Sequence, residues 1–250
     1  MSGRIIVLTG ASGLVGRRLV GHFLTAGDRL VALTSRPESA QSLQAEFDSK
    51  DLVCLGADLT QPGGVTAVCH ELRQRGLLPH ALINNARQRS NLAVGSSGPD
   101  AAQWQAEFML GVIASERLTS ALAQQAGSCL RAVVNISSMY GAVAVNPGLY
   151  ADPTAAAPIH YGVVKAALNH LTRELAVRLA GRGIRVNAVG FGGIEGRVDA
   201  TFKENYARLC PAGRMVSPEE IAGPVDFLLS DAAGAVTGVT LPADGGWTLW

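Results

Sequence analysis

The sequence predicts an α/β fold in which one doubly wound parallel sheet of about seven strands carries helices on both faces. Short apolar runs rich in β-branched residues alternate along the whole chain with longer runs that have helical spacing. The chain is 48% hydrophobic yet contains 29 glycines, a combination that favours tight turns between buried elements over disorder. Polar residues follow the apolar runs, and the carboxyl ends of the strands are where such sheets bind ligands.

The expected elements follow one another without a composition break or an internal repeat, so residues 1–250 are expected to form a single domain. The expected strands are residues 5–8, 29–34, 52–56, 81–83, 131–136, 184–189 and 236–241. The expected helices are residues 14–26, 39–47, 65–75, 100–125, 160–180, 200–209 and 218–229. Gly27 and Gly76 are suited to end helices, and Ser217 is suited to begin one. Segments 87–99 and 141–158 are expected to be loops, and long loops in compact domains are often functional.

Composition and charge exclude several classes of function. The formal net charge is +1, and no stretch has the clustered Lys and Arg that nucleic-acid binding requires. The first apolar run is too short for a secretory leader or a membrane span. The four cysteines have no CxxC spacing, so neither a metal site nor a disulfide framework is expected. We therefore expect a cytoplasmic protein that acts on a small molecule.

A glycine-rich turn lies between the first expected strand and the first expected helix, at residues 9–16. Glycines there let the backbone turn sharply and approach a pyrophosphate, whose charge the helix N-terminus stabilises. The alternative is a turn with a purely structural role. The residues expected to bind a dinucleotide cofactor here are Gly10, Ser12, Gly13, Leu14 and Val15.

The residues after the second and third strands bear on the choice of cofactor. Ser35 and Arg36 end the second strand, where an acidic residue would repel a 2′-phosphate and a guanidinium would bind it. This favours NADP, with NAD as the alternative if Arg36 is only a surface residue. Asp58, followed by Leu59, comes after the third strand. It is expected either to accept from the adenine amino group or to cap a helix beginning near Pro62.

Tyr161 and Lys165 lie four residues apart in a predicted helix, and positions i and i+4 share one face. An ammonium held near a phenol favours the phenolate, which equips such a pair for acid–base catalysis. The same spacing also arises by chance, with a packed Tyr and a solvated Lys. Residues 84–86 (Asn-Asn-Ala) and residues 135–138 (Asn-Ile-Ser-Ser) end neighbouring strands. The first group is expected to tie strands together and to line the cofactor cleft, and the second to bring a hydroxyl near the Tyr161 helix.

Taken in order, these motifs resemble those of the short-chain dehydrogenase/reductase family. The resemblance covers nearly the whole chain and extends to residues 185–187 (Arg-Val-Asn) and 244–246 (Asp-Gly-Gly). It implies a Rossmann-type fold and an NADP(H)- or NAD(H)-dependent oxidoreductase that interconverts a carbonyl and an alcohol. It further implies that Tyr161 exchanges a proton with the substrate oxygen, that Lys165 binds the nicotinamide ribose, and that Ser138 holds the substrate oxygen. Asn85, Ala86 and Ile194 are then expected to line the cofactor site, with no metal.

The chain departs from the family pattern at several positions. Gly111 stands where the family's active-site Asn normally kinks a helix and holds a water near the Lys. Arg87 and Phe191 replace a usual Gly and Pro, and the usual Thr after Ile194 is missing. These changes raise a second hypothesis, a catalytically impaired protein that binds cofactor as a sensor or scaffold. The glycine spacing raises a third, a dehydratase or epimerase of the family's extended branch, for whose substrate domain the chain is too short.

The substrate and the assembly are expected from the remaining segments. The interval from Ser138 to Tyr161 is longer than is usual in the family, and loop 146–153 is expected to lie over the site mouth. The motifs at residues 139–141 and 149–150 and the Trp-Thr-Leu-Trp end are similar to a bacterial subgroup linked to modification of flagellin and surface sugars. The resemblance also implies a homotetramer or homodimer. Three loop arginines predict a polar or anionic substrate, such as a sugar derivative, unless they are only solvated: Arg87, Arg89 and Arg197.

Overall fold

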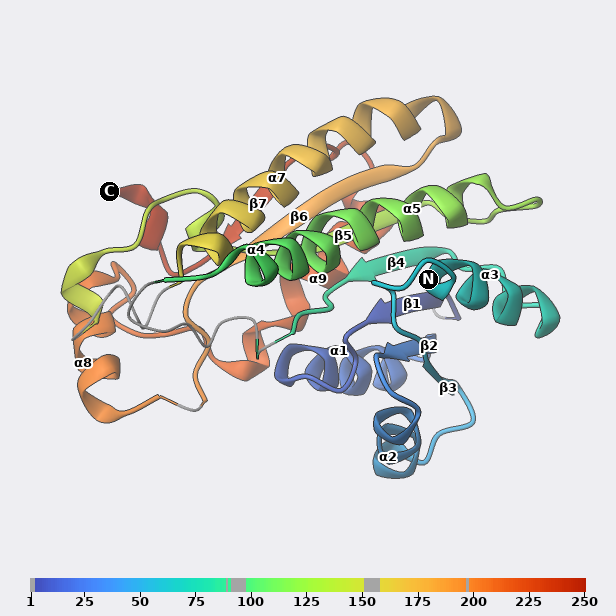
Figure 1. The fold of residues 1–250 in the computed structure, drawn as a ribbon, viewed down its shortest axis with the longest axis horizontal. Coiled ribbons are helices and arrows are strands. Elements are labelled where there is room, and N and C mark those ends of the chain that lie inside the picture. The colour runs from blue at the N-terminus through green and yellow to red at the C-terminus, as the bar shows by residue number, and fades with distance from the viewer. Residues whose placement is uncertain (1–2, 89, 91–97, 151–157, 197) are drawn as a thin grey trace.

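The computed structural model describes residues 3–88, 90, 98–150, 158–196 and 198–250. A seven-stranded sheet with the order β3-β2-β1-β4-β5-β6-β7 runs through the molecule (Figure 1), and every neighbouring pair is parallel. The order reverses between β1 and β4, which is the point where doubly wound sheets bind ligands. The predicted fold class is therefore confirmed. The strands are β1 (Ile5–Thr9), β2 (Arg29–Thr34), β3 (Leu52–Gly56), β4 (Ala81–Asn84), β5 (Ala132–Ser138), β6 (Arg185–Phe191) and β7 (Thr240–Ala243).

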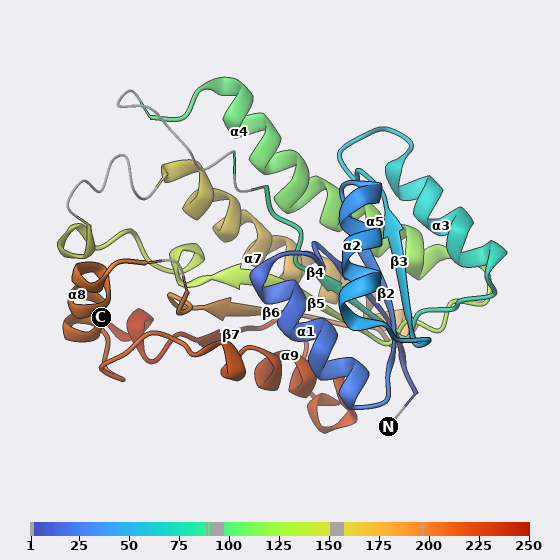
Figure 2. The ribbon, with the colours of Figure 1, turned by 90° about the horizontal axis from the view of Figure 1, so that it is seen from below.

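Helices cover both faces of the sheet (Figures 1 and 2). On β1, Ile6 and Leu8 belong to one apolar core and Val7 to the other, because successive side chains point to opposite faces. The first core is closed by α1 (Leu14–Thr25), α2 (Pro37–Phe47) and α9 (Ala222–Leu229). The second is closed by α3 (Gly64–Gln74), α5 (Ala114–Gln124) and α7 (Ile159–Leu179). Strands that are buried on both faces have nearly continuous apolar sequences, and this explains the short apolar runs found in the sequence.

The long helix expected over residues 100–125 is not one regular helix. The structure has α4 (Ala101–Phe108), a π-helical turn η2 (Met109–Ile113), and then α5. Gly111 lies at the centre of the π turn, where a Cβ would come within 2.6 Å of the Val164 side chain on α7. The glycine thus allows two helices to approach closely at the irregular turn, and π turns frequently lie at functional sites.

Two C-terminal boundaries also differ from prediction. The expected helix over 218–229 is a 3₁₀ turn, η6 (Pro218–Glu220), followed by α9, although Ser217 does form the predicted N-cap. The strand expected over 236–241 is wrong at its start, because β7 begins only at Thr240. Val236 and Val239 are held instead by the Asn187 side chain, which donates to the first carbonyl at 2.9 Å and accepts from the second amide at 3.2 Å.

A third apolar cluster lies beside α8 (Ala200–Leu209), close to the C-terminus in Figure 1. At its centre Tyr206 is fully buried and stacks on Trp247 with 4.5 Å between ring centroids. The Tyr206 hydroxyl accepts a hydrogen bond from the Gly193 amide at 2.9 Å. A Cβ at Gly192 would lie 2.7 Å from that hydroxyl. The glycines after β6 therefore admit the tyrosine that fixes α8 to the end of the sheet.

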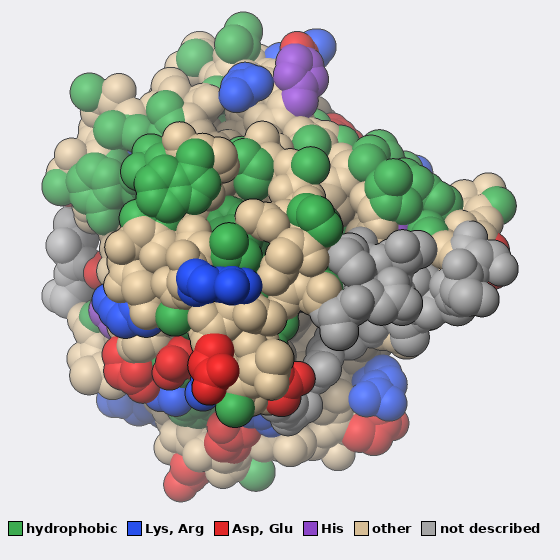
Figure 3. Space-filling model, turned by 90° about the vertical axis from the view of Figure 1, so that its left-hand side faces the viewer, with side chains coloured by type: hydrophobic (Ala, Val, Ile, Leu, Met, Phe, Trp, Pro, Cys, Tyr) green, Lys and Arg blue, Asp and Glu red, His purple; other side chains and the backbone are tan. Residues whose placement is uncertain are grey.

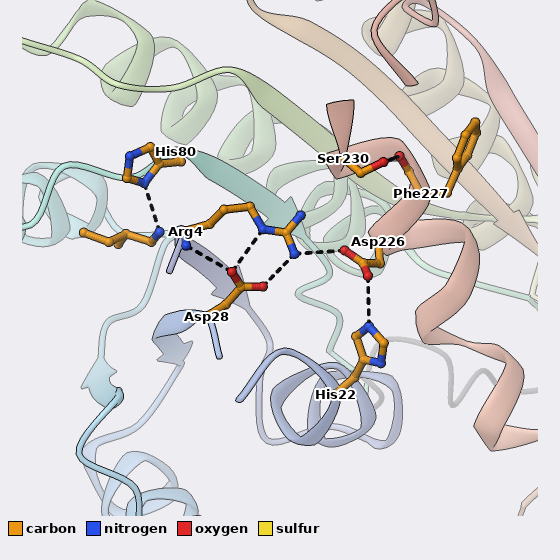
Figure 4. Close-up of polar contacts among 8 residues, drawn as sticks. Arg4, His22, Asp28, His80, Asp226, Phe227 and Ser230 are labelled. Carbon is orange, nitrogen blue, oxygen red and sulfur yellow. Dashed lines mark hydrogen bonds and ion pairs between the residues drawn. The ribbon is translucent and has the colours of Figure 1, made fainter. Parts of the chain in front are cut away.

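A charged cluster lies at the opposite, amino ends of the strands (Figure 4). The Arg4 guanidinium donates to Asp28 through Nε at 3.1 Å and Nη2 at 2.6 Å, and to Asp226 on α9 through Nη2 at 2.9 Å. His22 on α1 contacts the second Asp226 oxygen at 3.2 Å. Asp28 is 1% exposed. Its hydrogen bonds hold the pKa of Arg4 above the usual range, so the cluster carries a permanent charge.

The described residues bear on membranes and metals as well. None of their helices is long and apolar enough to cross a bilayer. They contain no group of three His, Cys, Asp or Glu side chains placed to hold a metal ion. All four cysteines are free, and burial raises the pKa of the Cys54 thiol to about 11. A neutral thiol of this kind is a poor nucleophile.

Candidate active site

The glycine turn connects β1 to α1 at the switch point of the sheet. Gly10 has a φ of +65°, and a Cβ there would lie 2.7 Å from the Ala86 Cα, so only glycine fits between the two segments. Gly13 is the N-cap of α1 and has no side-chain cap. The amides of the first turn therefore stay available to an anion. Ser12 and Val15 are half-buried beside this turn, and Leu14 is exposed.

The end of β4 is tied directly to the glycine turn. The Thr9 hydroxyl accepts hydrogen bonds from the amides of Asn85 and Ala86, both at 2.9 Å. The Asn85 side chain donates to the carbonyls of Thr9 and Gly10, both at 3.0 Å. Asn84 donates to Asn135 on β5 at 2.9 Å. The prediction that these amides tie neighbouring strands together is confirmed.

The residues expected at the adenosine end of a cofactor lie farther along the same edge. Ser35 and Arg36 are exposed directly after β2. Asp58 accepts hydrogen bonds from the Thr60 hydroxyl at 2.6 Å, the Thr60 amide at 2.9 Å and the Gln61 side chain at 3.4 Å. The Thr60 hydroxyl bond is the largest cause of its lowered pKa. Asp58 thus caps its own turn, and the alternative that it caps the next helix is wrong. The neighbouring Leu59 is buried.

Tyr161 and Lys165 lie on the first turns of α7. Lys165 is 7% exposed, and its ammonium donates to the Ile136 carbonyl on β5 at 2.8 Å. The same ammonium lies 5.7 Å from the centroid of the half-buried Tyr161 ring. Burial lowers the pKa of Lys165, and this outweighs the opposing effect of Tyr161. The structure therefore places a cation that is costly to keep charged next to a phenol, as an acid–base pair requires.

Ser138 ends β5 and is brought to the same place by close packing. The 3₁₀ turn η3 (Met139–Gly141) follows it, and the Ser138 hydroxyl accepts from the Tyr140 amide at 3.3 Å. A Cβ at Gly141 would lie 2.9 Å from the Lys165 carbonyl carbon. A Cβ at Gly162 would lie 3.2 Å from the Tyr140 carbonyl oxygen. The turn after Ser138 is thus packed directly onto the stretch of α7 that carries Tyr161 and Lys165.

Three further groups lie around the Tyr161–Lys165 pair. The Arg87 guanidinium lies over its ring, 4.5 Å from the centroid. Tyr140 and Tyr150 share a hydroxyl–hydroxyl bond of 2.7 Å, and burial raises the pKa of both. Glu107 on α4 is 3% exposed, and its carboxylate raises the pKa of Lys165. The sequence identified Arg87 as a departure from the family pattern, but Glu107 was missed. A carboxylate one helical turn before Gly111 was the feature of the sequence that could have indicated it.

The remaining expected positions are placed as follows. Ile194 forms an isolated bridge with Val216 and packs on the core under α9, directly after the Gly192–Gly193 segment. His160, next to Tyr161 in sequence, is fully buried, and its ring centroid lies 5.9 Å from that of Trp104, which indicates a packing role. Part of the predicted loop over the site and two of the three loop arginines lie outside the described residues: 151–157, Arg89 and Arg197.

A family model described as enoyl-(acyl carrier protein) reductase matches residues 10–248. This match and the geometry above decide the family. The chain is a short-chain dehydrogenase/reductase. It is 33% identical to Protein FixR of Bradyrhizobium diazoefficiens, with 97% of this chain and 86% of the relative covered. It is 31% identical to a galactitol 2-dehydrogenase of Rhizobium johnstonii, with 100% and 97% covered.

The subgroup likeness and the fold of this short-chain dehydrogenase/reductase are supported by further comparisons. The chain is 27% identical to the post-translational flagellin modification protein A of Campylobacter coli over the full length of both. A short chain dehydrogenase of Leptospira borgpetersenii with bound NAD+ superposes with a TM-score of 0.87 at 26% identity, covering 99% and 94%. A gluconate 5-dehydrogenase of Burkholderia cenocepacia in complex with NADP and tartrate gives 0.84 at 26% identity, covering 100% and 97%. Solved neighbours thus bind a nicotinamide dinucleotide of either kind.

Proposed function

We propose that the protein is an NADP(H)-preferring oxidoreductase that interconverts a carbonyl and an alcohol on a small, polar substrate. The observation that carries the proposal is the buried Lys165 ammonium, held by the Ile136 carbonyl at 2.8 Å and lying 5.7 Å from the Tyr161 ring. No carboxylate of the described residues forms an ion pair with Lys165, and a buried cation left without one costs stability. Active sites are where proteins keep such groups. Residues 1–250 would then act as one NAD(P)-binding unit.

The residues of the switch point suit a dinucleotide. The uncapped N-terminus of α1 and the close approach of Gly10 to Ala86 form a backbone cradle that a side chain would fill. When bound, the cofactor supplies the hydride acceptor or donor. Its pyrophosphate would lie against Gly10, Ser12, Gly13, Leu14 and Val15, its adenine near Asp58 and Leu59, and its nicotinamide half near Asn85, Ala86, Ile194, Tyr161 and Lys165.

The chain itself moves and holds protons. Tyr161 would give a proton to the substrate oxygen in reduction and take one in oxidation, and the Lys165 ammonium would favour its phenolate. Ser138 would hold the same oxygen by a hydrogen bond. Lys165 keeps two further N–H donors beyond the one given to Ile136, which suits a bond to a ribose hydroxyl.

The preference for NADP(H) rests on Ser35 and Arg36. Both are exposed at the end of β2, where the guanidinium can reach a 2′-phosphate. Arg36→Ala is expected to weaken NADPH binding by about 10- to 100-fold and to leave NADH binding unchanged, measured by fluorescence titration. Arg73→Ala, on the remote helix α3, is the matched control. An unchanged NADPH affinity in Arg36→Ala would show that the assignment of Arg36 to the 2′-phosphate is wrong.

A polar substrate, such as a sugar derivative, is supported by relatives and by the site. The relatives and neighbours include a galactitol dehydrogenase and a gluconate dehydrogenase. The hydroxyls of Tyr140 and Tyr150 and the Arg87 guanidinium bring polar groups to the surroundings of Tyr161. The proposal is tested by measuring turnover of a panel of polyols, sugar acids and their carbonyl counterparts through the change in NADPH absorbance. Turnover confined to apolar ketones would contradict it.

A second candidate function is cofactor binding without turnover, as in a sensor or scaffold. Gly111 favours it, because an Asn at that position would collide with Val164, so the family's usual side chain next to Lys165 does not fit. The two candidates are separated by NADPH titration combined with the same substrate panel. Binding without turnover of any substrate supports the sensor, whereas an activity that Tyr161→Phe abolishes excludes it.

Exposed apolar residues support assembly as a homotetramer or homodimer. The cytoplasm is the proposed location of this assembly. On α7, Ile159 is 64% and Val177 is 79% exposed. At the C-terminus, Leu249 and Trp250 are each 77% exposed. Apolar side chains gather on the face of the molecule that bears α8 and the C-terminus (Figure 3). Such patches commonly mark interaction surfaces. Light scattering of the purified protein tests the assembly, and a monomer at micromolar concentration would contradict it.

A further inference from the structure

Arg87 occupies a fixed position at the mouth of the site. The backbone just before it is anchored, because the amides of Asn85 and Ala86 both donate to the Thr9 hydroxyl at 2.9 Å. From there the exposed side chain crosses from the end of β4 to α7 and lies 4.5 Å over the Tyr161 ring. A cation over an aromatic face is attracted by the ring quadrupole. The ring therefore holds the guanidinium beside the phenol that would serve the substrate.

The donors of Arg87 form no hydrogen bond with the described residues. No carboxylate among those residues forms an ion pair with Arg87, whereas Arg4, Arg17 and Arg214 each have at least one. Contact with the ring face uses the charge of the guanidinium and none of its five N–H groups. Those donors form a fork that matches the two oxygens of a carboxylate. Arg87 thus presents an unfilled site for a planar anion next to Tyr161.

The charge around Tyr161 also favours an anion. Arg87 and Lys165 approach the same ring from two elements, and Arg87 further lowers the pKa of Lys165. Lys165 is 7% exposed, donates to the Ile136 carbonyl and has its further donors assigned to the cofactor ribose, so of the two cations Arg87 is the one left for an anionic group of the substrate. A carboxylate on Arg87 would relieve the repulsion between the two cations. One exposed guanidinium matches a singly charged carboxylate better than a doubly charged phosphate.

We propose that Arg87 is a specificity-determining residue that binds a carboxylate on the substrate beside the carbon that reacts. The proposal rests on the proposed oxidoreductase function and narrows its substrates to hydroxy acids and oxo acids. In oxidation the carbinol carbon loses a hydride to the oxidised nicotinamide and its hydroxyl loses a proton to Tyr161. The products are the oxo acid, the reduced nicotinamide and one proton, and the carboxylate is unchanged. Its bond to Arg87 places the carbinol near the Tyr161 hydroxyl.

The test uses three hydroxy acids and the neutral alcohols matched to them: gluconate and glucitol, glycerate and glycerol, 3-hydroxybutyrate and butan-2-ol. For the wild type, kcat/KM with NADP+ is expected to be at least about tenfold higher for an acid than for its neutral partner. Arg87→Gln is expected to lower kcat/KM for that acid by about 10- to 100-fold, the loss of a charge-assisted hydrogen-bonded pair. The loss of the charge beside Tyr161 and Lys165 acts on both substrates, so kcat/KM for the neutral partner is expected to change by a much smaller factor than kcat/KM for the acid. For Arg87→Lys, which keeps the charge but loses the forked donors, kcat/KM for the acid is expected to lie between those of the wild type and Arg87→Gln. Arg73→Gln is the surface control.

A second readout does not need turnover. Calorimetry of the NADPH-bound protein is expected to show binding of at least one of the acids that Arg87→Gln weakens about 10- to 100-fold, with NADPH affinity unchanged as proof of an intact fold. Equal preference for acids and neutral alcohols, or a loss in Arg87→Gln that affects both alike, would overturn the proposal. Wild-type protein that binds NADPH but none of the acids would also overturn it. Turnover of neutral polyols or of glucitol 6-phosphate alone would refute the carboxylate and leave the oxidoreductase function standing.

Discussion

Two cations of this protein, Arg4 and Lys165, are held in opposite ways at opposite edges of the sheet. Arg4 lies at the amino ends of the strands and donates to two carboxylates, one of them fully buried, which raises its pKa. Lys165 lies at the carboxyl ends and donates to a carbonyl, and burial lowers its pKa. The first arrangement fixes a charge permanently. In the second arrangement, burial favours the uncharged form of the amine.

The difference follows from what each partner contributes. A carboxylate offsets the desolvation of a buried cation by charge, whereas a carbonyl offers only a dipole. The Arg4 cluster joins α1, β1, β2 and α9, so its value is structural (Figure 4). The carbonyl that binds Lys165 offsets only part of the desolvation cost of the ammonium. Such an uncompensated cost is common where activity and stability compete. We therefore expect substitutions in the two regions to separate activity from stability.

The largest expected effect is on activity at the carboxyl edge. Lys165→Met is expected to lower kcat by about 10²- to 10⁴-fold, because the partner of Tyr161, the proposed general acid, is removed. It is expected not to lower the free energy of unfolding, because a poorly compensated buried charge is lost. Steady-state kinetics and urea denaturation measure the two quantities, with Lys50→Met as the exposed control. A large fall in stability would show that Lys165 is structural and would break the comparison.

The next effect is on stability at the amino edge. Arg4→Met is expected to lower the free energy of unfolding by about 3–5 kcal/mol, because Asp28 is left buried and unpaired. Activity per folded molecule is expected to stay unchanged. Urea denaturation of this variant is compared with Arg178→Met, whose exposed pair with Glu174 is expected to contribute less than about 1 kcal/mol. The double variant Arg4→Met, Asp28→Leu is expected to recover part of the loss, and no recovery would argue against the unpaired carboxylate as its cause.

A smaller effect sharpens the description of the Lys165 site. The carboxylate of Glu107 raises the pKa of Lys165, so Glu107→Gln should lower it further. The loss of activity at high pH, where Lys165 deprotonates, is then expected to begin at lower pH. On that basic limb kcat/KM is expected to be lower than that of the wild type at the same pH. The pH dependence of kcat/KM measures this, and Glu116→Gln on α5 is a matched control. An unchanged basic limb would remove Glu107 from the site.

The smallest effect concerns pH and the Arg4 cluster. Burial opposes ionisation of Asp226, but hydrogen bonds from Arg4 and His22 outweigh it, and the pKa of Asp226 is lowered on folding. Its contribution to stability is therefore present above its unfolded pKa, near ~3.9, and is lost as the pH falls through the folded value. Asp226→Asn is expected to cost about 1 kcal/mol or less at neutral pH. Denaturation curves of the two proteins should converge below about pH 4, and a constant difference would contradict the assignment.

Local pattern was enough to predict the glycine turn and the strands, apart from the start of β7. Each depends on residues close in sequence, such as a glycine at the first strand–helix junction. The Tyr161–Lys165 spacing also arises by chance, and it indicated a site only together with the other motifs along the chain. The rest depends on partners far apart in the chain. Arg4 reaches Asp226 across 222 positions, and the stacking of Arg87 on Tyr161 needs β4 and α7 side by side. The start of β7 was wrong for the same reason, since it is set by the Asn187 side chain on a neighbouring strand.

The buried stack of Tyr206 on Trp247 has a consequence for how this protein can diverge. A Cβ at Gly193 would lie 2.7 Å from the Tyr206 side chain, so this glycine and the tyrosine cannot change independently. A Cβ at Gly192 would also lie 2.8 Å from the Asp244 Cα, so that glycine is required whatever residue stands at position 206. Trp247 shares the constraint on Tyr206 through its 4.5 Å stack. In a family alignment, a tyrosine at position 206 should therefore co-vary with glycine at 193 and with an aromatic at 247. Grafting α8 from a relative with another substrate would need these three positions exchanged together.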